Sequence, residues 1–358
     1  MKSLPLFIAI TAGTIGCTPE TVTEEEEDTS VEDTDIEDTD EDTDEEEDTA
    51  VEDTGDVLLY DVPAAEDFSM LQEDAFESLI QRFTVDADHP INILGEGGTE
   101  LVIGPHQLRT STGEVVSGQV EIEFIEVFDR AGMLASDMPS QGRLPNGDVA
   151  QLISGGEHYV NATQNGDDLE LAGSMWMQVA TETTGGTDSE MTLFRPEEDG
   201  GPWVEEEPNP EAFGIGRAPG ADGKGVIDTY WLTSGDFGWT NIDKWYNDPR
   251  PKTEIQVEVP EGFGPDNCGV YMAYANEGSA LARFDTWDEN TQRFGEHYGL
   301  IPIGLDVHVL FVTESEGEWK YAIQSQTIVD GHLTVFDSPE TYPTGDMDDL
   351  SAAINGLP

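Results

Sequence analysis

Apolar and polar residues alternate along much of the chain from about Phe83 onward, which predicts strands with one buried face. In Gln119–Phe124 every second residue is apolar, and Ile125 then breaks the alternation, which predicts a bulge or a bend. Thr253–Val259 alternates in the same way. Val307–Val312 is almost continuously apolar, so we expect a central strand covered on both faces.

Two short turns predict hairpins between such strands. Asn165-Gly166 separates two strand-like segments and is a strong two-residue hairpin signal. The segment Ser315–Gly317 is expected to return the chain into a strand at Glu318–Gln324. Consecutive strands joined by tight turns run antiparallel, so these turns favour an antiparallel sheet.

Helical spacing is confined to the two ends of this region. Glu66–Arg82 has the pattern of a short amphipathic helix that leads into the first strand. Near the C-terminus, apolar residues recur at helical spacing after Asp346, a residue type that caps helix N-termini. We therefore expect a short C-terminal helix.

These elements predict an all-β, mostly antiparallel fold of two immunoglobulin-like β-sandwich modules with a short C-terminal helix. Residues 183–222 are rich in Gly, Pro and Glu, which marks a boundary between the modules. We place the first module at residues 83–200 and the second at residues 201–358, with a lead-in segment at residues 57–82.

The first seventeen residues resemble an export signal. One positive charge at Lys2 precedes the apolar stretch Leu4–Ile10, and small residues end at Gly16-Cys17. We interpret residues 1–17 as a lipoprotein signal in which Cys17 is acylated, so that the protein is exported and anchored in a bacterial envelope, at the outer membrane or the cell surface. The alternative is an ordinary signal peptide in which Cys17 plays no part.

Residues 18–56 form an acidic low-complexity tract with repeated Glu-Asp-Thr units. The tract contains too little apolar surface to fold, and its like charges repel one another and extend it. We therefore predict a disordered tether that holds the folded part away from the membrane.

Composition narrows the range of partners. The chain has 77 acidic and 14 basic residues, and its net charge of −63 is spread beyond the acidic tract. Nucleic acid binding needs a basic surface, so it is not expected, and neither is docking on an anionic bilayer. Such an excess of acidic residues indicates a saline environment, in which salt screens the self-repulsion.

Cysteine usage predicts no disulfide within the folded part. Only two cysteines occur, and acylation of Cys17 leaves Cys268 without a partner. Cys268 precedes an apolar run and has no neighbouring His or basic residue in the sequence, so we interpret it as a buried structural thiol.

Several short motifs occur over about residues 83–342. They are Gly98–Ile103, Thr112–Val120, Leu152–Tyr159, Met191–Phe194, Trp203, Gly238–Asp243 and Leu300–Gly304. They resemble the patterns GT-x-I-x-I-P, G-x-V-x-G-x-V, L-x-S-G-G and G-W-x-N-x-D of a family of uncharacterised bacterial envelope lipoproteins. Gly104 displaces the proline of the first pattern, and Ile242 stands where the family often has Cys. The resemblance implies an envelope location and a β fold, but no reaction.

The densest group of aromatic and polar residues lies in and beside the segment Gly238–Asp243. Trp239, Asn241, Asp243 and Trp245, together with Trp231, have the composition of a sugar-binding platform, on which rings stack and polar side chains orient hydroxyls. The alternative is that Trp239 fills the core and the polar side chains satisfy backbone groups of a turn.

No metal or catalytic motif is evident. The six histidines lack metal-ligand spacing, and the segment Ser154-Gly155-Gly156 lacks the frame of a nucleophile elbow. We therefore predict no cofactor, with Ca²⁺ bound in the loops Asp86–Asp88 and Asp285–Asn290 as the remaining alternative.

The sequence favours a lipid-anchored, surface-exposed, non-enzymatic protein with a binding, adhesive or envelope-structural role. Its expected partners are the membrane, through the lipid anchor, and a glycan or an envelope protein. Two alternatives stay open: a secreted carbohydrate-active hydrolase with an unidentified carboxylate pair, and a calcium-dependent adhesion module.

Overall fold

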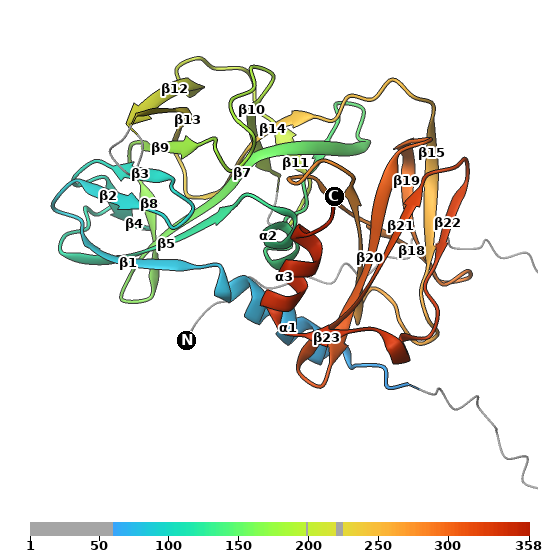
Figure 1. The fold of residues 1–358 in the computed structure, drawn as a ribbon. Helices are drawn as coiled ribbons and strands as arrows, with labels where there is room; N and C mark the ends of the chain where they lie inside the picture. Colours follow the sequence, from blue (N-terminus) through green and yellow to red (C-terminus); the bar gives the residue numbers. More distant parts are fainter. Residues whose placement is uncertain (1–59, 198–199, 220–224) are drawn as a thin grey trace, which may run out of the picture. The chain divides into compact units, whose positions relative to one another are not determined.

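A computed structural model describes residues 60–197, 200–219 and 225–358 (Figure 1). The predicted signal sequence, Cys17 and the acidic tract lie outside these residues. The described part, from residue 60, belongs to one compact unit built almost entirely from β-sheets. The predicted all-β, mainly antiparallel sandwich class is confirmed.

The first pair of sheets is formed by the strands up to Trp245. One sheet has the central order β1-β5-β7-β14-β10-β11-β6, with β8 and β4 attached beside β7. Its strands are β1 (Gln81–Asp86), β4 (Leu108–Thr110), β5 (Gln119–Val127), β6 (Gln141–Arg143), β7 (Val149–Gln164), β8 (Asp167–Leu171), β10 (Thr192–Pro196), β11 (Trp203–Glu205) and β14 (Gly238–Trp245).

The second sheet of this pair has the order β12-β13-β9-β3-β2. Its strands are β2 (Ile91–Leu94), β3 (Glu100–Ile103), β9 (Met175–Ala180), β12 (Phe213–Pro219) and β13 (Val226–Ser234). Alternate residues of both sheets fill one core between them, with Ile122, Met177 and Ile242 fully buried. This packing of two antiparallel faces is the arrangement of a β-sandwich.

The C-terminal part forms a second pair of sheets. One has the order β18-β19-β15-β22 and the other β17-β16-β20-β21-β23. The strands are β15 (Lys252–Glu258), β16 (Cys268–Tyr274), β17 (Leu281–Arg283), β18 (Thr286–Asp288), β19 (Arg293–Pro302), β20 (Asp306–Ser315), β21 (Glu318–Thr327), β22 (His332–Val335) and β23 (Thr344–Gly345). Their core includes Val257, Phe294 and Phe311.

Three helices join the two sandwiches through a shared core. They are α1 (Ala65–Ser78), α2 (Arg130–Ala135) and α3 (Met347–Asn355), and Figure 1 shows them between the two pairs of sheets. The 3₁₀ turn Pro339–Thr341 precedes β23. Phe68, Met133 and Ile354 bring these helices into one cluster with apolar side chains from both sandwiches. The described body therefore has three hydrophobic cores: one inside each sandwich, and a third that is formed by the helices together with residues of both sandwiches.

A buried arginine also ties the two sandwiches together. Arg130, at the start of α2, is 1% exposed and donates hydrogen bonds to the backbone carbonyls of Tyr274, Glu277 and Leu357. Burial lowers the pKa of its guanidinium, and the charge of nearby Glu277 opposes this shift. The three carbonyls satisfy the hydrogen-bond donors of the buried guanidinium. The side chain thus links the first sandwich to the loop after β16 and to the C-terminus.

Both predicted hairpins are confirmed. Asn165 and Gly166 have φ values of 56° and 88°, and Glu316 and Gly317 have φ values of 56° and 84°, so positive φ at both central residues produces the tight turn in each case. The C-terminal helix is also confirmed, and the carboxylate of Asp346 accepts a hydrogen bond from the N–H of Asp349.

The predicted bulge at Ile125 is wrong. The register of β5 is continuous against both β1 and β7. The alternation breaks because β5 is buried on both faces at this point: Phe124 lies in the first sandwich core, and Ile125 lies in the shared core. A strand covered on both sides loses its polar face.

The chain passes from the first pair of sheets to the second after residue 245, not at residue 200, where the sequence analysis placed the boundary between the modules. That boundary falls between β10 and β11, which hydrogen-bond to each other in one sheet. The strands up to Trp245 belong to the first pair of sheets, and those from Lys252 belong to the second. The described parts of the segment 183–222, which is rich in Gly, Pro and Glu, therefore contribute β10, β11 and β12 to the first sandwich.

In the described part of the chain, no helix has the length and apolar content that crossing a bilayer requires.

Candidate functional site

Two of the sequence motifs meet side by side in the structure. The segment Leu152–Tyr159 lies on β7 and Gly238–Asp243 lies on β14, and these two strands pair antiparallel. Asn241 is opposite Glu157, whereas Asp243 is opposite Ser154. Two residues of β7 thus face the single residue Ile242, which is the pattern of a β-bulge.

The bulge places four polar side chains on one face of the sheet. In a regular strand Ser154 and Glu157 would point to opposite faces, because they are three residues apart. The extra residue at Gly155-Gly156 brings both side chains to the same face of the sheet. Their pairing partners on β14, Asp243 and Asn241, present their side chains on that face too. These four residues are called the β7–β14 polar cluster below.

The two glycines are required by the local geometry. Gly156 has φ +133°, and a Cβ there would lie 2.7 Å from the ring of Phe128. A Cβ on Gly155 would lie 3.0 Å from the backbone oxygen of Ile242. The bulge therefore requires glycine at position 156, whereas a side chain at position 155 would make a tight contact with the backbone of β14.

Hydrogen bonds connect three members of the polar cluster. The Ser154 hydroxyl donates to Asn241 Oδ1 at 3.0 Å, and Asn241 Nδ2 donates to Asp243 Oδ2 at 2.7 Å. The N–H of Gly156 donates to Ser154 Oγ at 3.1 Å. Asn241 thus has a fixed orientation between a hydroxyl and a carboxylate.

Both carboxyl groups of the cluster are removed from solvent. Glu157 and Asp243 are each 0% exposed. Burial raises the pKa of Glu157 well above its usual value, and the neighbouring Asp243 raises it further. Burial also raises the pKa of Asp243, against the opposing effect of the neighbouring polar side chains of Ser154 and Asn241. Desolvation therefore opposes ionisation of both groups.

The aromatic residues predicted with these polar side chains do not form one exposed strip. Trp239 is 6% exposed, and its ring contacts those of Tyr159 and Trp203 inside the shared core. Trp245 is half-buried, and its indole N–H donates to Glu205 Oε2 at 2.8 Å. Trp231 lies on β13, in the other sheet of this sandwich.

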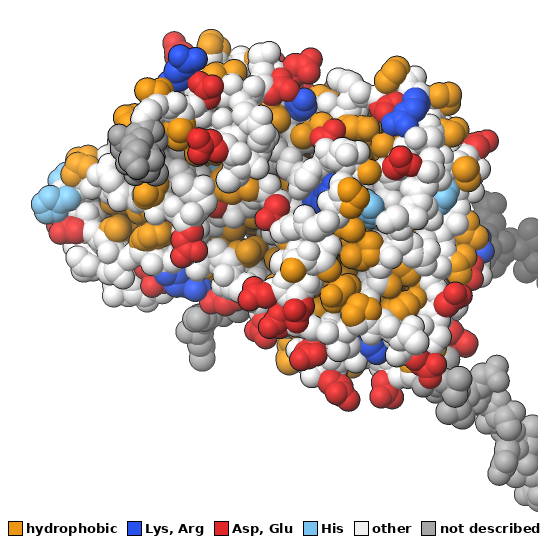
Figure 2. All heavy atoms as spheres, in the orientation of Figure 1, with side chains coloured by type: hydrophobic (Ala, Val, Ile, Leu, Met, Phe, Trp, Pro, Cys, Tyr) orange, Lys and Arg blue, Asp and Glu red, His pale blue; other side chains and the backbone are white. Residues whose placement is uncertain are grey.

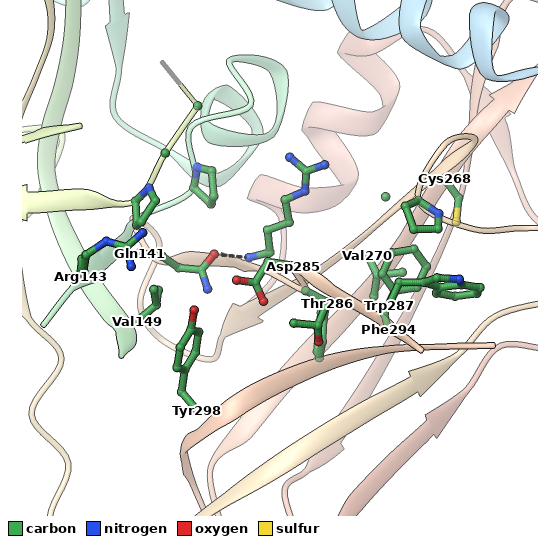
Figure 3. Close-up of a pocket in the computed structure, with 18 residues that line it drawn as sticks. Gln141, Arg143, Val149, Cys268, Val270, Asp285, Thr286, Trp287, Phe294 and Tyr298 are labelled. Carbon is green, nitrogen blue, oxygen red and sulfur yellow. Dashed lines mark hydrogen bonds between the residues drawn. The ribbon is translucent and has the colours of Figure 1, made fainter. Parts of the chain in front are cut away.

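A second group of residues lines a cleft between the two sandwiches (Figure 3). The cleft has a volume of about 240 Å³. Trp287 of β18 and Phe294 of β19 lie close together in one wall, with ring centroids 4.9 Å apart. Gln141 and Arg143 of β6 belong to the opposite wall. The two walls thus come from segments more than 100 residues apart in the sequence.

Hydrogen bonds hold the two walls of the cleft together. The N–H of Arg283 donates to Gln141 Oε1 at 2.7 Å, which Figure 3 marks with a dashed line. Arg283 also donates from its guanidinium to Asp137 Oδ1 at 2.7 Å. The N–H of Ser140 donates to the carbonyl of Leu281 at 3.0 Å. The cleft is therefore preformed.

Polar groups gather at the end of the cleft away from Trp287. Figure 3 shows the Tyr298 hydroxyl, the side chains of Gln141 and Arg143, and the carboxylate of Asp285 around this end. Arg143 also forms a 3.5 Å ion pair with Glu197. The cleft thus offers an aromatic wall together with hydrogen-bond donors and acceptors.

Glu296 stabilises the backbone at Tyr298 through hydrogen bonds. Its carboxylate accepts hydrogen bonds from the N–H groups of Tyr298 and Gly299, at 2.9 and 3.2 Å. Burial raises the pKa of Glu296 to about 7. The charge of nearby Asp285 also raises it, whereas the two hydrogen bonds lower it. Glu296 itself does not line the cleft.

Cys268 lines the same cleft from β16 but is 3% exposed. Its thiol donates to the carbonyl of Gly264 at 3.2 Å, and burial raises its pKa well above the usual range. A protonated thiol is a poor nucleophile and a poor metal ligand. These features agree with the structural role expected from the sequence.

The acidic loops considered for Ca²⁺ use their carboxylates to stabilise turns. Asp86 Oδ1 accepts from the N–H of Asp88 at 3.0 Å. Asp288 accepts from the N–H of Asn290 and from the hydroxyl of Thr291. Within the described ranges, no group of three or more His, Cys, Asp or Glu side chains is arranged to hold a metal ion.

Sequence reasoning missed the cleft, although it named Asn241 and Asp243 of the polar cluster as candidate ligand-binding residues. Asp285 was considered only as part of a loop, and Trp287, Tyr298, Gln141 and Arg143 were not considered at all. The available signal was the pair Trp287 and Tyr298, two aromatic residues on the paired strands β18 and β19. The local sequence pattern around Trp287 and Tyr298 does not show that β6 forms the opposite wall of the cleft, or how far away that wall lies.

The sequence matches no protein-family model, and no curated protein matches it. The fold and the two candidate sites therefore rest on the geometry described above.

Proposed function

We propose that this protein is an exported, lipid-anchored envelope protein without enzymatic activity, and that its folded body binds a saccharide in the cleft between the two sandwiches. The observation that carries the proposal is the composition of the cleft. Trp287 offers an aromatic ring, and Arg143, Asp285, Gln141 and Tyr298 offer polar groups in the same space. Sugars present an apolar ring face and hydroxyls, which such a site matches.

Binding is favoured over hydrolysis by the carboxylates at the cleft. Glycoside hydrolases generally place two carboxyl groups on either side of the bond that they cleave. Among the described residues, Asp285 is the only acidic residue that lines the cleft. Glu296, whose pKa is about 7, is turned toward the backbone of Tyr298 and Gly299. The cleft therefore has one carboxylate where a hydrolase would use two.

The envelope location rests on the sequence of residues 1–56. The acidic surface of the folded body fits a spacer role for the tract. An anionic bilayer repels both the body and the tract, so the body stays away from the membrane surface. Figure 2 shows acidic side chains spread over one face of the body with few basic ones among them. The same distribution supports the expectation that nucleic acid is not a partner.

Two experiments test the proposal. The full-length chain, expressed in a bacterial host, should fractionate with membranes, whereas Cys17→Ser should release it into the soluble fraction. Membrane association that is unchanged in Cys17→Ser would contradict the lipid anchor.

The second experiment is a glycan array probed with the full-length chain in detergent, with and without Ca²⁺. Saturable binding that does not depend on Ca²⁺ is the expected result. Binding only in the presence of Ca²⁺ would favour calcium-dependent adhesion, and no binding in either condition would favour an envelope-structural role or a protein partner.

A further inference from the structure

The β7–β14 polar cluster contains buried oxygen atoms that no protein group satisfies. Both carboxylate oxygens of Glu157 and Oδ1 of Asp243 have no hydrogen-bond partner in the described structure. Both residues are 0% exposed. An unpaired ionised carboxylate in a protein interior is strongly unfavourable, so something must neutralise these groups.

Glu157 is directed into the cluster by the strand register. It lies directly opposite Asn241 on the same face of the sheet, beside Asp243 and Ser154. The bulge at Gly155-Gly156 is the feature that turns it to this face. Glu157 therefore shares this buried face of the strand pair with three other oxygen-bearing side chains, and it lies close enough to Asp243 for the two carboxyl groups to interact.

No basic side chain in the described residues compensates the two carboxyl groups. The charged group that acts on Glu157 is Asp243, which is itself acidic. Lys244 is the next residue along β14, but it points to the opposite face and forms a 2.7 Å ion pair with Asp188. Arg130 directs its guanidinium to backbone carbonyls.

We propose that the β7–β14 polar cluster binds one Ca²⁺ ion between Glu157 and Asp243, with the side-chain oxygens of Asn241 and Ser154 as further ligands. The cluster supplies oxygen donors only, which suits a hard cation. Two carboxylates balance a divalent charge within a site that excludes bulk water. The inference does not depend on the saccharide cleft, because the two sites share no residue.

Ca²⁺ fits these ligands better than the other common cations do. It accepts six to eight oxygen ligands in irregular geometry and takes carboxylates in the bidentate mode. Mg²⁺ requires near-octahedral geometry and retains several waters, for which a fully buried strand pair has little room. A monovalent ion would leave one carboxylate charge uncompensated. The rival explanation is that the carboxyl groups are simply protonated, which needs no ion.

The test is thermal unfolding of the full-length chain after chelation, at pH 7.5 and constant ionic strength. Addition of Ca²⁺ to about 100 times its dissociation constant should raise the melting temperature by about 5 °C or more, whereas equal Mg²⁺ should have a much smaller effect. Na⁺ compared with choline at equal concentration should have no specific effect. Because ionic strength is held constant, general screening of the acidic charge of the chain is the same in every sample.

Three variants locate the ion. Glu157→Gln and Asp243→Asn keep the side-chain size and should abolish the Ca²⁺ response. Asp288→Asn is the matched control, because it removes a carboxylate from an exposed acidic loop and should retain the full response. If either cluster variant does not fold, equilibrium dialysis of the wild-type chain and of Asp288→Asn with ⁴⁵Ca²⁺ should still give one high-affinity site in each at high NaCl concentration.

Several results would overturn the proposal. The wild-type chain could show no Ca²⁺ response, or Na⁺ could replace Ca²⁺ fully. A response that survives in both cluster variants but is lost in Asp288→Asn would assign the ion to the loop. A variant Glu157→Gln that is more stable than the wild-type chain, in the absence of any Ca²⁺ effect, would identify a protonated pair.

Discussion

Trp239 packs against Tyr159 and Trp203 in the shared core, whereas Trp287 is half-buried in the wall of the cleft. Replacing Trp239 with Ala should lower the free energy of unfolding by about 3–5 kcal/mol, because a large buried ring is removed and a cavity remains. Urea unfolding followed by circular dichroism measures this change. Trp287→Ala is the comparison and should cost clearly less; equal losses would show that Trp239 is not part of a core.

At the residue scale, the sequence predicted which side chains are grouped but not where they face. The aromatic and polar residues of the Gly238–Asp243 motif were interpreted as an exposed platform or as a core with turn residues. Alternation shows that Trp239, Asn241 and Asp243 share one face. It does not show that a second sandwich covers this face, because that contact comes from residues far along the chain.

The bulge in β7 can be tested as an element. Gly156→Ala should destabilise the protein by about 2 kcal/mol or more, because a side chain at φ +133° is strained and its Cβ meets Phe128. Gly166→Ala is the matched control: Gly166 also has positive φ, but nothing lies within 4 Å of an added Cβ. Its cost should be about 1 kcal/mol. Chemical denaturation of both variants measures the difference, and a smaller loss for Gly156→Ala would contradict the bulge geometry.

At the element scale, hairpins and strands were predicted well because the signals are local. Asn165-Gly166 needs only its own two residues to adopt the turn. The broken alternation at Ile125 is also a local signal, but its cause is the shared core on the second face of β5. Burial on both faces and a bulge produce the same pattern in the sequence, and only tertiary packing distinguishes them.

The shared core of helices and strands has a consequence for the whole molecule. Because α1, α2 and α3 pack against both sandwiches, neither sandwich can lose its structure without exposing apolar surface of the other. Thermal unfolding of the full-length chain should therefore show one cooperative transition in calorimetry and in near-ultraviolet circular dichroism. Two separated transitions would show that the sandwiches unfold as independent domains.

Buried acidic groups should also make stability depend on pH. The pKa of Glu296 is raised to about 7, and those of Glu157 and Asp243 are raised as well. An acid whose pKa is higher in the folded state binds more protons there, so stability falls as pH rises from about 4.3, the value for an unfolded glutamate, through about 7. In chelator, the free energy of unfolding should decrease between pH 5 and pH 8.

Glu296→Gln isolates one part of this pH dependence. The variant should show a smaller decrease in the free energy of unfolding between pH 5 and pH 8 than the wild-type chain, measured by urea unfolding at each pH. A decrease of the same size in both would show that Glu296 does not titrate in this range.

The saccharide cleft is the central claim, and a side-by-side glycan array of three full-length proteins tests it most directly. The wild-type chain and Trp176→Ala, which removes a half-buried ring from β9 outside the cleft, should bind the same glycans. Trp287→Ala should bind them about tenfold more weakly, because a ring contact contributes about 1.5 kcal/mol. Glycan binding that is equally strong in Trp287→Ala, or that is absent from the wild-type chain, would contradict the proposal.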